Sequence, residues 1–408
     1  MRLCLPLLVG LACLLPPALA SAQGAKQQKR VALGLDAARG LSLLGDGFVR
    51  VHFTSWENKS PPTLATANVI DVKKGERISV ELPVADLAGK WKEAFYDGSP
   101  LRTVKSGRTL GDVEIEPIGY DGKELVAVLR QYRFGPKVSE GYAKQRYLIA
   151  RWDLESKSVT AVSTLADLEK GSWLRHFGLT RDGKAIWFYV DRGADGTRRV
   201  QVHRYDLEAK AAKVVATVEL PLREKRHDLH AFASRDHAKL AILEYSEQGD
   251  GVLSPPAKGA IVDTASGKSV TFDVPVTPYG VDFDGAGKRL AVGSNQAATL
   301  QLFDAETGKQ LAKIKGAKYV HLLAFSKSDR WIYTLASNLG GKTLDAYAVP
   351  SLKKKSLPVG KIVPGSQCFD AEGSVLAPDR SWVATWASGP KNKLCWADKT
   401  AVDIITLD

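Results

Sequence analysis

The stretch VDFDGAGKRLAV, residues 281–292, followed by LQLFDAETGK, residues 300–309, is the clearest indication of the fold of this chain of 408 residues. Both segments contain short apolar runs next to a turn rich in Asp and Gly, which is the pattern of paired β-strands. Phe283 and Leu290 flank the first turn and lie seven residues apart. We therefore expect a strand, a tight turn and a second strand, and then a third strand that ends at Phe303 and Asp304.

The same pattern recurs along the chain, and a regular recurrence of this kind is the signature of a repeat architecture. The recurrences with two apolar residues seven positions apart begin at Ile118, Leu179, Ala233, Phe283, Phe325 and Leu376, and a weaker one surrounds Asp46 and Gly47. Ends of third strands with an Asp are found at Asp71, Asp153, Asp206, Asp263 and Asp304. Seven copies of four strands predict an all-β fold, a seven-bladed β-propeller with four-stranded blades.

The two ends of the chain predict how the ring closes. The last copy stops at its third strand, residues 401–408, whereas residues 28–35 form a strand-like segment without a partner. We predict that this N-terminal strand completes the last blade, because closure removes exposed sheet edges. No long amphipathic helix is visible, and residues 86–93 and 167–170 predict short helical turns at most.

Residues 1–22 have the pattern of a secretory signal peptide, with Arg2, an apolar run over residues 3–15 and small residues before the cleavage point. The run is shorter than the ~20 residues of a transmembrane helix, so we predict no membrane span. The mature chain, 23–408, is then one propeller domain that is periplasmic or secreted. Two cysteines leave with the signal, and we predict a disulfide between Cys368 and Cys395 in an oxidising compartment.

Charge narrows the range of partners. The chain has 57 Lys and Arg against 45 Asp and Glu, a formal net charge of +12. Because an exported protein does not meet chromosomal DNA, we expect no nucleic-acid partner. The basic residues of the segment 86–112 predict an alternative partner, an acidic envelope or extracellular polymer. We expect a monomer.

Candidate site residues come from the first strand of each repeat, because first strands line the central channel of a propeller. Counting back from each turn places seven polar candidates there: Glu114, Arg175, His176, His230, Tyr279, His321 and Glu372. Imidazoles and carboxylates that converge on one cavity can bind a divalent metal or act as acid and base, and His176, His230 and His321 are the metal candidates. The alternative is that these polar side chains line a hydrated channel mouth.

The repeats at 281–292 and 300–309 resemble those of the YVTN-type and WD-repeat-like propellers of exported bacterial proteins, the broad group with quinoprotein-amine-dehydrogenase-like folds. This resemblance implies a propeller over the whole mature chain, but propellers of this group include enzymes and binding scaffolds alike. The chain has no Gly-x-Ser-x-Gly elbow, His-Glu-x-x-His motif or phosphate-binding loop.

The sequence therefore favours an exported, non-catalytic propeller that binds a protein or ligand through its loop-rich face and channel mouth. A metal-assisted hydrolase or lactonase-like enzyme is the first alternative. A binder of acidic polymers is the second.

Overall fold

A computed structural model gives the structure of the chain. It describes residues 28–33, 38–53, 66–81, 86–87, 89–96, 113–134, 142–169, 172–180, 182–194, 197–221, 228–245, 257–274, 278–294, 299–316, 320–338, 341–356, 374–387 and 398–406.

The described strands form seven four-stranded antiparallel sheets, which we number as blades in chain order. Blades 1 and 2 comprise β2 (Ala38–Gly45), β3 (Phe48–Phe53), β4 (Thr66–Asp71), β5 (Glu76–Glu81), and β6 (Val113–Tyr120), β7 (Glu124–Phe134), β8 (Tyr142–Asp153), β9 (Ser158–Glu169). Blades 3 and 4 comprise β10 (Ser172–Leu179), β11 (Ala185–Ala194), β12 (Thr197–Asp206), β13 (Ala211–Pro221), and β14 (Asp228–Ala233), β15 (Lys239–Tyr245), β16 (Ala257–Asp263), β17 (Ser269–Val274).

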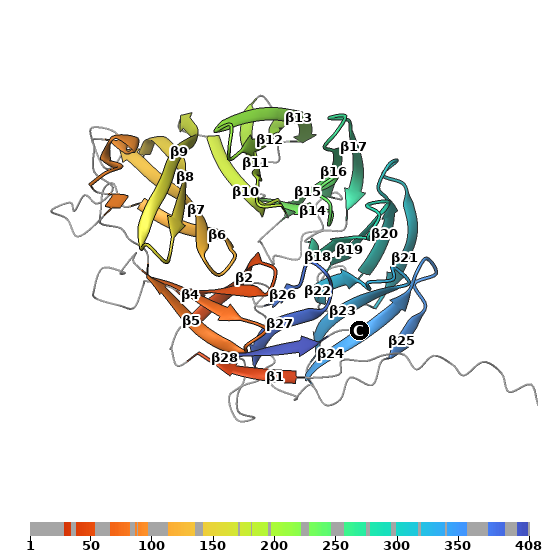
Figure 1. Cartoon of the computed structure of the whole chain (residues 1–408). Coiled ribbons are helices and arrows are strands. Elements are labelled where there is room, and N and C mark those ends of the chain that lie inside the picture. The colour runs from red at the N-terminus through yellow and green to blue at the C-terminus, as the bar shows by residue number, and fades with distance from the viewer. Residues whose placement is uncertain are drawn as a thin grey trace, which may run out of the picture.

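Blades 5 and 6 comprise β18 (Pro278–Phe283), β19 (Arg289–Ser294), β20 (Thr299–Asp304), β21 (Gln310–Lys315), and β22 (Val320–Phe325), β23 (Trp331–Asn338), β24 (Gly341–Ala348), β25 (Lys354–Ser356). Blade 7 comprises β26 (Ser374–Leu376), β27 (Trp382–Ala387), β28 (Asp398–Thr406) and β1 (Gln28–Ala32). The blades stand in a ring with the first strand of each nearest the centre (Figure 1). The predicted seven-bladed propeller is confirmed.

The N-terminal strand closes the ring as predicted. β1 pairs antiparallel with β28, from Gln28 opposite Ile405 to Ala32 opposite Ala401. Arg30 stands opposite Asp403, and its Nε and Nη2 donate to the two carboxylate oxygens at 2.8 and 3.0 Å. The carboxylate is buried, so this bidentate pair fixes the register of the closing strand.

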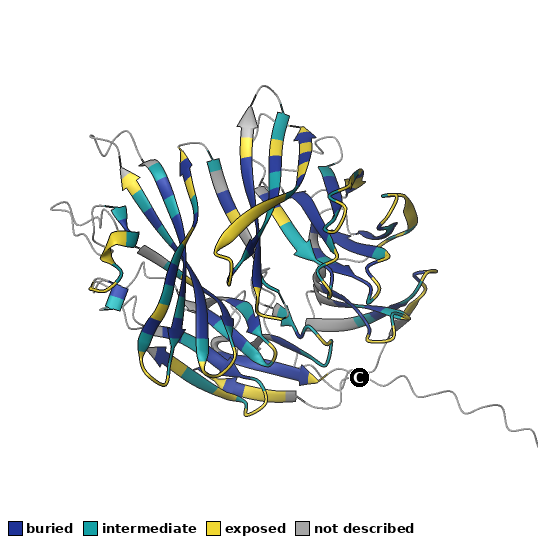
Figure 2. Ribbon diagram, turned by 45° about the horizontal axis from the view of Figure 1, so that its top comes forward, coloured by how far each residue is buried: buried dark blue, intermediate teal, exposed yellow. Residues whose placement is uncertain are grey.

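The hydrophobic core lies between neighbouring blades. Each cluster of buried side chains joins two consecutive sheets; Ile186 and Phe188 of β11, for example, pack with Val126 and Ile149 of blade 2. The second strands β7, β11, β15 and β19 are buried on both faces over most of their length, as the continuous apolar run 185–190 predicts for β11. Exposure increases towards the turns and outer strands (Figure 2).

The two faces of the ring differ in the length of their connections. Connections from first to second and from third to fourth strands have two to five residues, and we call their side the turn face. Every connection longer than five residues leaves from the opposite side, which we call the loop face. These connections are residues 54–65, 82–112, 135–141, 222–227, 246–256, 357–373 and 388–397.

The first-to-second turns share a backbone conformation. In blades 3 to 7, the N–H of the fourth turn residue donates to the carbonyl of the first at 2.8–3.0 Å, and the fourth residue has a left-handed φ of 56–69°. The fourth residues are Gly183, His237, Gly287, Asp329 and Arg380. Glycine adopts this conformation without strain, whereas another L-residue costs roughly 1–2 kcal/mol. The presence of non-glycine residues at this position in blades 4, 6 and 7 therefore needs an explanation.

The helical turn expected over residues 167–170 is wrong at its described part, because β9 continues to Glu169. Asp167 stands opposite Arg146 in the β8–β9 ladder and accepts from its Nε and Nη2 at 2.9 and 3.0 Å. This cross-strand pair overrides the local helix propensity of the acidic segment. The expected short turns over 86–93 are confirmed, by one helical turn at Asp86 and Leu87 and the 3₁₀ turn η1 (Lys92–Ala94).

Candidate functional site

The structure places six of the seven candidate site residues on innermost strands. Glu114 lies in β6, Arg175 and His176 in β10, His230 in β14, Tyr279 in β18 and His321 in β22. Glu372 and both cysteines of the predicted disulfide, Cys368 and Cys395, lie outside the described residues. These residues therefore lie near the axis of the ring. Their position on innermost strands does not by itself bring their side chains together in one site.

The side chains of only two of these candidates are described. Arg175 and His230 are exposed, and the His230 ring stacks against Phe232 in its own strand, with 6.5 Å between ring centroids. The described part of the chain contains no group of three His, Cys, Asp or Glu placed to hold a metal ion. Since His176 and His321 have no described side chains, the three-histidine site stays a prediction.

Buried polar side chains tie down the bases of the connections on the loop face. Gln131 of β7, 2% exposed, accepts the backbone N–H of Tyr96, which belongs to the connection between blades 1 and 2, at 2.7 Å. Fully buried Gln145 donates to the carbonyl of Ser172, where blade 3 begins, at 3.2 Å. A packed core would favour apolar residues at both places, so these amides serve to fix backbone at the loop face.

The same arrangement continues through blades 3 and 4. The Tyr189 hydroxyl donates to the carbonyl of Leu229 at 2.6 Å, at the start of blade 4. Glu244 accepts the N–H of Lys258 at 2.7 Å, across the base of the connection 246–256. Buried Asp191 accepts a forked hydrogen bond from Arg198 across the base of the connection 195–196. The loop face thus rests on a rigid base from which its connections emerge.

The turn-face end of the axis carries a buried charge cluster that joins blades distant in sequence. Asp282 of β18 accepts the N–H of Phe325 in blade 6 at 2.8 Å and forms an ion pair with Arg380 of blade 7. The two charged side chains are 8% and 11% exposed. Arg380 is one of the non-glycine residues with left-handed φ, and this pair gives the reason for its presence.

A second charged pair lies beside the first. Arg235 of blade 4 reaches over blade 5 to Asp329 of blade 6, with 3.7 Å between Nη2 and Oδ1, and donates to the carbonyl of Ser326 at 3.3 Å. Asp329 also accepts the N–H of Gly285 at 2.9 Å. A Cβ at Gly285 would lie 2.8 Å from the Asp329 Oδ2, so glycine is what allows the pair to lie over this turn.

Burial and charge oppose each other in this cluster. Burial raises the pKa of Asp282 to about 6, although the charge of Arg380 and the hydrogen bond from Phe325 act in the opposite direction. Burial lowers the pKa of the Arg380 guanidinium, which Asp282 partly offsets. The cluster consequently fixes blades 4 to 7 to one another at a high desolvation cost, and we assign it a structural role.

The described part of the predicted basic segment, residues 86–87 and 89–96, packs against blade 2. Leu87 and Phe95 are buried in the core between blades 1 and 2. Asp86 accepts the N–H of Val159 at 3.0 Å, and Trp91 donates to the carbonyl of the same residue at 3.3 Å. Because β9 is the outer strand of its blade, this segment covers a sheet edge that is otherwise free to pair.

Aromatic and charged groups fix the end of that segment. Arg146 lies 4.2 Å from the Tyr96 ring centroid and donates to the carbonyl of Ala94 at 3.0 Å, and the Tyr96 hydroxyl donates to Asp167 at 2.9 Å. Burial, with the hydrogen bond to Asp167, raises the pKa of Tyr96 to about 12. Of the five basic residues predicted for polymer binding in this segment, Lys90 and Lys92 are described and exposed.

The sequence patterns predict neither the charge cluster nor the polar side chains at the base of the loop face. Asp282 and Arg380 are 98 residues apart, and no local pattern relates them. The sequence does contain one indication of the cluster. Arg380 and Asp329, like His237, occupy the turn position at which blades 3 and 5 have glycine. A bulky residue at a position that favours glycine points to a role for its side chain.

Comparisons with known proteins support the fold. No protein-family model matches the chain, and no curated protein sequence matches it. A chain in the crystal structure of a mitotic checkpoint complex is similar over 100% of this chain and 99% of its own length, with a TM-score of 0.51 and 14% identity. A chain of Kuenenia stuttgartiensis hydrazine synthase is similar over 75% and 81%, with a TM-score of 0.41 and 13% identity. The first likeness shows a WD40-like propeller fold.

Proposed function

We propose that this chain is an exported, non-catalytic propeller that binds a protein partner through its loop face. The observation that supports the proposal is the division between the two faces. All connections longer than five residues leave from one side, and buried polar side chains hold backbone at three of them, 82–112, 222–227 and 246–256. Long loops on a rigid scaffold are the usual place of binding sites.

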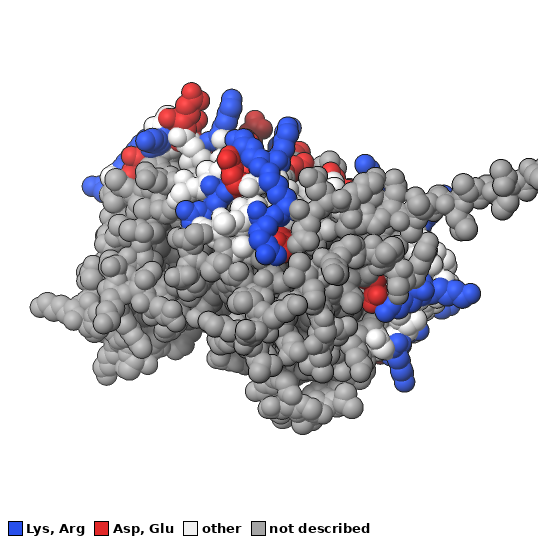
Figure 3. Space-filling view, turned by 90° about the horizontal axis from the view of Figure 1, so that it is seen from below, with Lys and Arg blue, Asp and Glu red and all other residues white. Residues whose placement is uncertain are grey.

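The alternatives have less support in the described residues. The metal-assisted hydrolase requires imidazoles to converge, and the one metal-candidate side chain that is described, His230, stacks on Phe232 of its own strand. The acidic-polymer binder requires a continuous basic surface. Figure 3 shows, on the side seen from below, described Lys and Arg side chains among Asp and Glu side chains. Each alternative has its own test. If the chain is a metal-assisted hydrolase, adding zinc to the metal-stripped protein should change its melting temperature. If it binds acidic polymers, the affinity should fall steeply with salt concentration.

A pair of matched variants tests the proposal. In one, the connection 246–256 is replaced by a two-residue turn like that at 195–196, which shortens a loop without removing a strand. In the control, Glu306→Lys and Lys309→Glu exchange charges on the turn face. The mature chain and both variants are used, after chemical cross-linking, to capture proteins from the exported fraction of the producing cell. Unfolding midpoints confirm that each variant is folded.

We expect a protein that is retained by the mature chain and by the turn-face control and lost from the loop-shortened variant. Loss from the control alone, or retention of no protein by the mature chain, contradicts the proposal. Export has a separate readout, because N-terminal sequencing of the exported protein should begin near residue 23. A cytoplasmic protein that keeps residues 1–22 would refute export without bearing on the loop face.

A further inference from the structure

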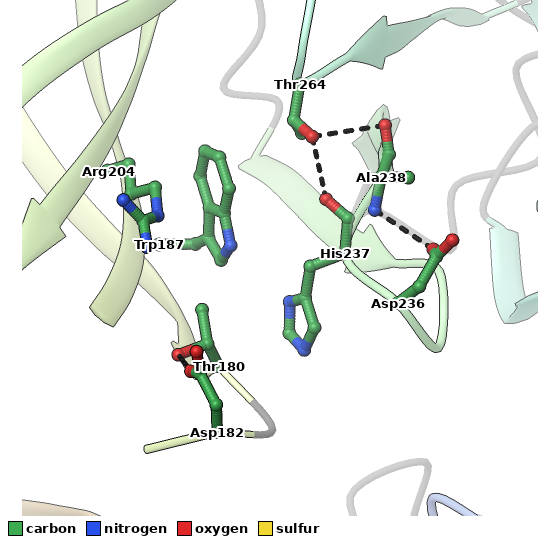
Figure 4. Close-up of a pocket in the computed structure, with 8 residues that line it drawn as sticks. All are labelled: Thr180, Asp182, Trp187, Arg204, Asp236, His237, Ala238 and Thr264. Atoms are coloured by element: carbon green, nitrogen blue, oxygen red, sulfur yellow. Dashed lines mark hydrogen bonds between the residues drawn. The ribbon is translucent and has the colours of Figure 1, made fainter. Parts of the chain in front are cut away.

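A cavity of about 530 Å³ opens on the turn face between blades 3 and 4, on the side of the ring opposite the loop face. It is lined by residues from both blades, shown in Figure 4: Thr180, Asp182, Trp187, Arg204, Asp236, His237, Ala238 and Thr264. Its volume is within the range of small-molecule sites. Neither the loop-face partner nor the charge cluster of blades 4 to 7 accounts for this cavity.

His237 is held in the cavity by a strained backbone. Its φ is +58°, at the turn position where blades 3 and 5 have glycine. Its N–H donates to Ser234 at 2.9 Å, and its carbonyl accepts from the Thr264 hydroxyl at 2.9 Å, so the surroundings fix this conformation. Left-handed non-glycine residues that are fixed by their surroundings are found most often at functional sites.

At this turn position, the side chains of the two other non-glycine residues form ion pairs, whereas the His237 side chain forms none with the described residues. Asp329 and Arg380 form the ion pairs of the charge cluster. The Nδ1 atom of His237, in contrast, is buried without a hydrogen-bond partner among the described residues. Burial lowers the pKa of His237, although the charges of Asp236 and Asp182 act to raise it, and the imidazole is therefore neutral at pH 7.

Trp187 provides a second and independent sign of a missing partner. The residue is 4% exposed, and its indole Nε1–H has no acceptor among the described residues. In Figure 4 the indole stands between Arg204 and His237, with Thr180 and Asp182 beyond its end. A buried donor without an acceptor is costly, so a ligand that brings an acceptor would gain from it.

The two carboxylates of the cavity are charged, and one oxygen of each accepts hydrogen bonds from its own turn. One oxygen of Asp182 accepts from the Thr180 hydroxyl at 2.5 Å and the Lys184 N–H at 3.1 Å, and these bonds hold the pKa of Asp182 below its usual range. Asp236 accepts from Ala238 and from a serine hydroxyl in its own turn, and although burial raises the pKa of Asp236, these bonds keep it low. The second oxygen of each carboxylate is available to accept further hydrogen bonds.

The combination of groups selects the chemistry of the ligand. The cavity offers donors from the indole and the Arg204 guanidinium, and acceptors from two carboxylates and the imidazole. An anion would be repelled by Asp182 and Asp236, and a simple cation would leave the indole N–H without an acceptor. Hydroxyl groups donate and accept at once and bring no charge.

We propose that this cavity is a binding site for a neutral, hydroxyl-rich ligand, a sugar unit, held by Trp187, His237, Arg204 and the carboxylates of Asp182 and Asp236. The site is independent of the loop-face partner. The proposal explains why a histidine with a left-handed backbone stands where blades 3 and 5 have glycine.

Calorimetric titration of the mature chain tests this, with glucose, galactose, mannose and N-acetylglucosamine as neutral probes, and inorganic phosphate and putrescine as charged probes. We expect at least one sugar to bind and neither charged probe to compete with it. Trp187→Phe should weaken binding by about tenfold or more, as the loss of one hydrogen bond from a buried donor implies. Trp152→Phe is the matched control, because Trp152 is also a buried tryptophan whose Nε1–H has no acceptor in the described part of the chain, but it lies outside the cavity.

His237→Gly separates a ligand-binding role from a structural one. Glycine relieves the left-handed strain and removes the imidazole, so binding should be lost while the unfolding midpoint stays equal or rises. Three results overturn the proposal: no sugar binds, a charged probe binds in their place, or sugar affinity is unchanged in both Trp187→Phe and His237→Gly. A His237→Gly chain that binds normally and melts lower would show a structural histidine.

Discussion

Replacing one partner of the buried ion pair between Asp282 and Arg380 should have unequal effects, depending on which partner is removed. In Asp282→Asn, the guanidinium of Arg380 stays 11% exposed and cannot lose its proton. Breaking a buried pair in this way costs roughly 3–5 kcal/mol. We expect the free energy of unfolding to fall by about that amount, although the asparagine oxygen still accepts the N–H of Phe325.

Arg380→Gly leaves the carboxylate instead, and a carboxylate can become neutral by binding a proton. If its pKa rises to roughly 8–9, as documented for buried acids, the carboxyl is neutral in the folded variant at pH 7. Compared with the parent chain, where its pKa is about 6, the loss of the ionised form costs about 1.4 kcal/mol. The glycine also relieves a left-handed φ of +65°, which returns roughly 1 kcal/mol. We therefore expect Arg380→Gly to lower the free energy of unfolding by about 2 kcal/mol or less.

The pH dependence has a definite sign. The pKa of Asp282 is raised by burial to about 6 in the folded chain, against an ordinary value of 3.8. The folded state then binds more protons than the unfolded state between these values, so the contribution of Asp282 to stability rises as pH falls from about 6 towards 3.8. On acidification, the free energy of unfolding should therefore increase more for Arg380→Gly than for the parent chain. In Asp282→Asn, residue 282 does not titrate and should contribute no such increase.

Urea denaturation followed by tryptophan fluorescence at pH 7 and pH 5 measures both effects. Glu219→Gln is the control, because the ion pair of Arg199 with Glu219 is 61% and 60% exposed and should contribute less than about 1 kcal/mol. Equal losses for Asp282→Asn and Arg380→Gly, or a loss below about 1 kcal/mol for Asp282→Asn, would refute the reasoning.

Three further predictions concern closure, packing and oxidation. Deleting residues 28–33 uncovers the edge of the closing blade, so sedimentation should show concentration-dependent association, and an unchanged monomer with an unchanged melt would argue against closure by this strand. Gly285→Ala places a Cβ 2.8 Å from the Asp329 carboxylate and should cost about 1–3 kcal/mol in urea unfolding; a neutral effect would mean that the pair moves aside freely. Alkylation of the exported protein should modify Cys368 and Cys395 only after reduction, and two thiols that react beforehand would exclude the disulfide.

The strands could be predicted from the sequence because the interactions that mark them are local. The Asp at the end of a third strand accepts from the turn that follows it: Asp304 accepts from the N–H and the hydroxyl of Thr307 at 2.8 Å, and Asp263 does the same with Ser266. Alternation and turn residues lie within a few positions of each other. Such features are visible in a single sequence.

The candidate sites could be predicted only in part, because their partners come from different blades. Counting from the turns placed six polar residues on the innermost strands, but no count shows that Arg235 reaches Asp329 or that Trp187 faces His237. The helical turn expected over 167–170 is wrong because a partner 21 residues away on the neighbouring strand of the same blade, Arg146, stabilises the strand. Local patterns specify elements, and contacts between blades specify sites.

Site-specific photo-cross-linking compares the two faces most directly. A photoreactive residue is placed at Arg133, exposed at the loop-face end of β7, and in a second chain at Glu306, exposed in a turn on the other face. Both chains are illuminated in the compartment to which the protein is exported. If the loop face binds a protein, position 133 forms a covalent adduct with another protein and position 306 forms none. An adduct from position 306 alone, or from neither position, would contradict binding through the loop face.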